Sequence, residues 1–125
     1  MKHKNTRFAF IAACSITVLA DCSSNDSPQA EHQRALTQAM SVAPSDEHLA
    51  TLYKQSCKAC HAIDHSGAPL VQDHSQWDTR WDKGLPALMQ SVVAGFNGMP
   101  AGGQCFSCTA QDYEALIKFL AGRAR

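Results

Sequence analysis

The sequence predicts an all-α domain in which three or four short helices pack around a common centre. Several segments carry apolar residues at helical spacing, and Gly or Pro residues separate these segments. The clearest stripe follows the i, i+3, i+4, i+7 pattern and consists of Tyr113, Leu116, Ile117 and Leu120. No stretch shows the alternation of apolar and polar residues that is typical of a half-buried β-strand.

The first two expected helices lie in the middle of the chain. Ser45 can cap a helix whose first turn is acidic and whose apolar residues recur at helical spacing up to Cys57. Ser75 can cap a second, shorter helix, which contains Trp77 and ends at Gly84.

The last two expected helices are more apolar. One runs from Leu85 to about Gly95 and has an amphipathic pattern. The other begins at Thr109, where the carboxylate of Asp112 is placed to reach back as in a capping box.

Residues 1–20 have the pattern of an export signal. Basic residues precede an apolar run from residue 8 to residue 20, which is too short to span a bilayer as a stable helix. Cleavage after Ala20 would release a soluble chain. Alternatively, the Leu19–Cys22 stretch resembles a lipoprotein signal, so that the leader is residues 1–21 and Cys22 carries lipid, although Asp21 stands where such signals prefer a small residue. Either reading predicts the bacterial periplasm.

The rest of the chain divides into a polar segment and one domain. Residues 21–43 contain few large apolar side chains, and we expect a flexible or loosely helical tether there. Residues 44–125 form the expected packed domain, which is so small that a cofactor would help to stabilise it.

The most informative motif is Cys57-Lys58-Ala59-Cys60-His61, which has the C-x-x-C-H form of a c-type haem attachment site. Two thiols on one helical turn can form thioethers with the haem vinyl groups, and the histidine that follows can bind the iron. A thioredoxin-like redox pair and half of a zinc site are the alternatives. The motif predicts one covalently bound haem c at the centre of the helices.

Met99 is the best candidate for the second iron ligand. It lies in a loop rich in Gly and Pro, which gives the backbone the freedom to bring its sulfur to the ring. A gap-filling role in the core is the alternative for Met99, as it is for Met89. His65 or His74 could bind the iron if Met99 did not reach it.

Cys105 and Cys108 form a second C-x-x-C pair, but a threonine follows it, so it is not a second ordinary haem site. In an oxidising compartment we expect a disulfide there. A zinc site built from both pairs and a catalytic dithiol are the alternatives.

Taken together, these features resemble the cytochrome c5 family, a group of class I c-type cytochromes that transfer electrons in bacteria. The resemblance covers roughly residues 48–122 and rests on C-x-x-C-H, Gly67-Ala68-Pro69, Trp77, Arg80, Met99-Pro100, Gly102-Gly103, Cys105-x-x-Cys108 and Asp112. It implies that Met99 is the axial sulfur ligand and that Cys105 and Cys108 are a disulfide.

The resemblance also assigns roles around the haem. It implies that the carbonyl of Pro69 holds the ring of His61, and that Trp77 and Arg80 lie near the haem propionates. The alternatives are a core position for Trp77 and a solvated charge for Arg80.

These features predict a one-electron carrier and not an enzyme, since two axial ligands leave no open site on the iron. The chain has 11 basic and 11 acidic residues without a basic block, so no nucleic-acid partner is expected. Expected partners are redox proteins: membrane oxidase or dehydrogenase complexes and other cytochromes. Contact with a membrane is expected only through a lipid anchor. A small haem enzyme or sensor with a labile sixth ligand, and a zinc-binding structural module, are the alternatives.

Overall fold

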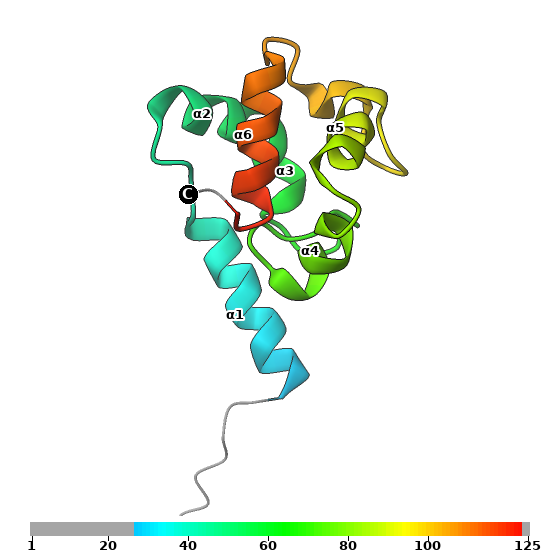
Figure 1. The fold of residues 1–125 in the computed structure, drawn as a ribbon. Helices are drawn as coiled ribbons and strands as arrows, with labels where there is room; N and C mark the ends of the chain where they lie inside the picture. Colours follow the sequence, from blue (N-terminus) through cyan, green and yellow to red (C-terminus); the bar gives the residue numbers. More distant parts are fainter. Residues whose placement is uncertain (1–26, 124–125) are drawn as a thin grey trace, which may run out of the picture.

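The computed structural model describes residues 27–123, which fold into short helices with no β-strand among them (Figure 1). The α-helices are α1 (Pro28–Ser41), α2 (Glu47–Leu52), α3 (Lys58–His61), α4 (His74–Trp81), α5 (Leu85–Ala94) and α6 (Ala110–Leu120). A π-helical turn, η1 (Tyr53–Cys57), and a 3-10 turn, η2 (Ala101–Gln104), complete the set. The predicted all-α fold class is confirmed.

Helices α2, η1 and α3 follow one another without a loop and carry the C-x-x-C-H motif at their end. Asp46 caps α2, because its carboxylate accepts a hydrogen bond from the backbone N–H of Leu49 at 2.9 Å. The expected cap, Ser45, lies one residue too early. The wider turn of η1 comes directly before the motif, and such π-helical insertions are frequent at functional sites.

Helix α6 packs against both α2 and α5 and supplies much of the core. Its buried residues are Leu116, Ile117, Phe119 and Leu120. The ring of Phe119 meets the ring of Tyr53 edge to face, with centroids 5.1 Å apart. The predicted capping box is present, since Thr109 and Asp112 exchange side-chain to backbone hydrogen bonds.

Helices α4 and α5 are separated by Gly84, and α5 ends at Gly95. Both glycines have φ of +83°, a conformation that L side chains rarely adopt. Asp73 caps α4 by accepting from the backbone N–H of Ser75 at 3.0 Å, so Ser75, the expected cap, lies inside the helix.

The segment expected to be a flexible or loosely helical tether contains α1, which is a regular helix of 14 residues. Ser27 caps it and Pro28 occupies its first turn, both favourable starts for a helix. Ala39 is fully buried in the core cluster of the domain. The composition of this segment is polar, but its few apolar side chains lie on the core: Ala35 and Leu36 are partly buried against the same cluster as Ala39.

The leader and Cys22 lie outside the described residues. Among residues 27–123, no helix is both long and apolar enough to cross a membrane.

Candidate haem-binding site

The two cysteines of the motif are free thiols, Cys57 at the end of η1 and Cys60 three residues further on in α3. Cys57 is half-buried and Cys60 is exposed. Burial raises the pKa of the Cys57 thiol to about 11, and the nearby Cys60 adds to this effect. Neither thiol is in a disulfide, and Cys60 is open to solvent, as attachment of a cofactor requires.

His61 is the buried polar side chain of this region, with 8% of its surface exposed. Its Nδ1 lies 2.7 Å from the carbonyl oxygen of Pro69. A carbonyl only accepts, so Nδ1 must carry the proton and donate it, which leaves Nε2 as the nitrogen with a free lone pair. Orientation by a carbonyl is the usual arrangement of a histidine that binds a metal.

The pKa of His61 is lowered, which favours the neutral imidazole. Burial is the largest cause, and the positive charge of Arg80 acts in the same direction, while the hydrogen bond to Pro69 opposes both. A neutral imidazole is the form that binds iron.

Trp77 supports His61 from the side. It is buried, and its indole ring stacks near the imidazole, with centroids 5.9 Å apart and planes 28° apart. Its N–H donates to the carbonyl of Leu70 at 2.7 Å. The indole has only this donor, which favours the core position for Trp77, and its contact with a haem propionate stays a prediction. Arg80 is exposed and donates to the carbonyl of Gln76.

Met99 is half-buried in the loop between α5 and η2. Its backbone pairs with that of Phe96 through two hydrogen bonds of 2.9 and 3.0 Å. Gly95 makes the turn possible, because a Cβ there would come within 3.0 Å of the Met99 carbonyl oxygen. Beyond the loop, the hydroxyl of Tyr113 lies 3.1 Å from the carbonyl oxygen of Gly102. The backbone of the methionine loop is thus held at both ends.

Cys105 and Cys108 form a disulfide, with Cα atoms 5.4 Å apart. A zinc site made from both C-x-x-C pairs does not fit, because these two sulfurs are bonded to each other. No group of three or more His, Cys, Asp or Glu side chains in the described part of the chain is arranged to hold a metal. The alternative iron ligands His65 and His74 are exposed and paired with aspartates, at 3.2 and 3.1 Å.

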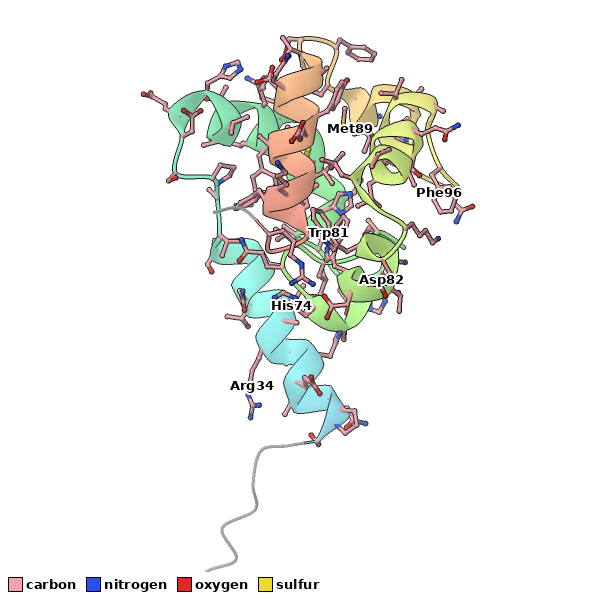
Figure 2. The ribbon with its side chains drawn as sticks, viewed as in Figure 1. Arg34, His74, Trp81, Asp82, Met89 and Phe96 are labelled. Atoms are coloured by element: carbon pink, nitrogen blue, oxygen red, sulfur yellow. A yellow bond between two sulfur atoms is a disulfide. The ribbon has the colours of Figure 1, made fainter. Side chains whose placement is uncertain are left out.

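Two further observations test whether haem fits here. Helix α5 is rich in apolar residues, yet none of its side chains is buried: Leu85, Leu88, Met89 and Val92 are half-buried and Val93 is exposed. In Figure 2, Met89 lies between α5 and α6, and Phe96 points away from the domain. The buried hydroxyl of Tyr53 has no hydrogen-bond partner in the structure. A partly buried apolar face and an unpaired buried hydroxyl beside the motif both fit a large ring with polar edges.

A small all-α domain with a carbonyl-held histidine directly after two free cysteines defines the class of c-type cytochromes. The comparisons with known proteins agree. Residues 44–120 match the family model described as "Cytochrome C oxidase, cbb3-type, subunit III". Cytochrome c5 of Azotobacter vinelandii is 37% identical over 68 residues, which are 53% of this chain and 82% of that protein. Cytochrome c5 of Ectopseudomonas mendocina is 32% identical over 68 residues, 53% of this chain and 78% of that protein.

A solved structure agrees as well. The cytochrome c described as part of "electron transfer complex of nitrite reductase with cytochrome c" has a TM-score of 0.55 and 28% identity, covering 64% of this chain and 98% of that one. The chain therefore belongs to this family of c-type cytochromes and is a cytochrome c5-like class I cytochrome. Its membership implies covalently bound haem c and makes it an electron carrier rather than an enzyme.

Proposed function

We propose that this protein is an exported mono-haem cytochrome that carries single electrons between redox proteins of the respiratory chain. The observation that carries this proposal is the setting of His61, which is buried and hydrogen-bonded to the carbonyl of Pro69, directly after two free cysteines. In this proposal Cys57 and Cys60 would hold one haem covalently, and His61 and Met99 would be the two protein ligands of its iron.

The residues of the chain would restrict the chemistry to electron transfer. The haem would supply a one-electron couple. With both His61 and Met99 bound to it, the iron would have no free position for a substrate or for oxygen. The apolar side chains of α5 would keep water from the ring, and a soft thioether ligand favours a high reduction potential.

The proposal extends to the organisation of the chain. Residues 1–20 would be the export signal, or residues 1–21 if Cys22 is lipidated, and residues 44–125 the haem domain. The periplasm would be the site of action, with the protein either soluble or lipid-anchored. One structural neighbour was solved in complex with nitrite reductase, which supports a redox enzyme as the kind of partner.

Replacement of the proposed sulfur ligand tests this function. We expect Met99→Ala to abolish the far-red absorption band of the oxidised protein and to lower its midpoint potential. Met89→Ala is the matched control, because Met89 is also half-buried but lies on α5, and it should leave the band in place. If Met99→Ala left both the band and the potential unchanged, another residue would fill the sixth position, and the proposed coordination would be wrong.

A further inference from the structure

Helix α1 lies outside the region that this chain shares with its family, which begins at residue 44. It nevertheless packs against the domain. Ala39 has no exposed surface and belongs to the same core cluster as Leu70, Val71 and Ala121. The helix therefore lies outside the matched region and still has a definite packing position on the domain.

Polar contacts of α1 converge on the segment that follows the haem-binding motif, here called the Pro69 loop (residues 62–72). The ring Nε2 of His32 lies 3.2 Å from the carboxylate of Asp64. The side-chain amide of Gln38 donates to the side chain of Gln72 at 3.3 Å.

A third contact joins α1 to the motif itself, because the Lys58 ammonium donates to the carbonyl of Met40 at 3.0 Å. A pocket lined by Gln38, Gln72, His74 and Gly122 lies where α1 meets the ends of α4 and α6. Thus α1 contacts the Pro69 loop at both of its ends and also the helix that carries His61.

The Pro69 loop is the element that orients His61. Its Pro69 carbonyl accepts from the ring Nδ1 at 2.7 Å, and the backbone N–H of Val71 donates to the carbonyl of His61 at 2.8 Å. Two residues of α4 hold Leu70 in this loop. The side-chain oxygen of Gln76 accepts from the backbone N–H of Leu70, and the indole N–H of Trp77 donates to the Leu70 carbonyl. The contacts of α1 add a second, outer support to the same loop.

We propose that α1 is a positioning element that holds the Pro69 loop against His61 and limits the access of water to the Nδ1–Pro69 hydrogen bond. This inference rests on the proposed function only in that His61 binds the haem iron. If α1 is loosened, the loop opens more often, so the ring N–H exchanges faster with solvent. A weaker hydrogen bond also makes the imidazole a poorer electron donor, so the midpoint potential should rise.

The test uses the full-length, haem-loaded protein. Ala39→Leu places a larger side chain where there is no free surface and should displace α1. Gln33→Leu is the matched control, since it adds the same side chain at an exposed position of the same helix. The readout is the exchange rate of the His61 Nδ1 proton, measured by NMR, beside the exchange rates of the α6 backbone amides.

We expect Ala39→Leu to accelerate exchange of the His61 proton at least tenfold, with the α6 amides and the Gln33→Leu protein within twofold of the wild type. Equal acceleration of the His61 proton and the α6 amides would overturn the proposal, because it would show a general loss of stability. An unchanged His61 rate in a protein whose α1 amides exchange freely would overturn it too.

A second variant covers the case in which Ala39→Leu does not fold. His32→Asn combined with Gln38→Ala removes two contacts with the Pro69 loop and leaves the core intact. The same proton should then exchange several-fold faster, and an unchanged rate would contradict the proposal. The haem spectrum separates the two hypotheses: absence of haem would refute the proposed function, whereas bound haem with unchanged exchange would refute only the role of α1.

Discussion

Replacement of Trp77 by phenylalanine should destabilise the domain by about 2–4 kcal/mol. The change removes the hydrogen bond from the indole N–H to the Leu70 carbonyl, which is worth about 1 kcal/mol. That carbonyl keeps a second donor, the backbone N–H of Asp73 at 3.2 Å, so it is not left without a partner. The smaller ring also leaves a cavity beside His61, and the lost packing adds about 1–3 kcal/mol.

The assay is guanidinium unfolding of the haem-loaded protein, followed by far-UV circular dichroism. A domain of this size has a total stability of roughly 5–10 kcal/mol, so a loss of this size shifts the midpoint clearly. Trp81→Phe is the control. Trp81 is half-buried, and its ring centroid lies 5.9 Å from the guanidinium carbon of Arg123. We expect this variant to lose less than about 1 kcal/mol of stability. Equal losses for the two variants would refute the role assigned to Trp77.

Three further predictions concern the loops. Gly95→Ala should destabilise the fold by about 2 kcal/mol or more and weaken the far-red band. Gly95 has φ of +83°, and the new Cβ would meet the Met99 carbonyl. Thermal unfolding measures the loss of stability, and absorbance measures the band. Tyr113→Phe removes a hydroxyl that bonds two loop carbonyls and should cost about 1–2 kcal/mol in chemical denaturation; an unchanged midpoint would contradict this. The hydrogen bond from His32 lowers the pKa of Asp64 below its ordinary 3.8. The ionised Asp64 therefore stabilises the fold above pH 3.8, and this stabilisation is lost as the pH falls through the folded-state pKa. Asp64→Asn should flatten the acid limb of a plot of thermal midpoint against pH.

Local sequence signals were sufficient for much of this fold. Thr109 and Asp112 form the predicted capping box, and Gly84 and Gly95 lie at the predicted helix ends. The motif at Cys57–His61 needed no tertiary information, because its chemistry depends on spacing within a single turn of helix. For the same reason the sequence alone is enough to locate the candidate haem site.

Features that depend on distant partners were missed. The polar composition of residues 28–41 did not predict a regular helix packed on the domain. Ala39 stabilises this helix by packing into a core cluster whose other members, such as Leu70 and Ala121, lie far along the chain. The signal was present in Ser27-Pro28, a typical cap and first-turn pair. The partner of the Trp77 indole could not be predicted either, since the hydrogen bond depends on where the Pro69 loop turns.

The N-caps show a smaller kind of error. At α2 and α4 an aspartate and a serine within two residues of each other could each cap the helix, and in both cases the aspartate does so while the serine does not. Asp and Ser have similar preferences for this position, so only the backbone conformation decides between them.

The most direct test of the central claim is the optical spectrum of the full-length protein, produced with a haem-maturation system and recorded oxidised and then reduced with dithionite. The account predicts sharp α and β bands in the reduced protein, and a weak far-red band in the oxidised protein from a sulfur ligand to the iron. Haem bands without the far-red band would contradict ligation by Met99 and favour a haem enzyme or sensor. A protein without haem absorbance would contradict the proposed function altogether.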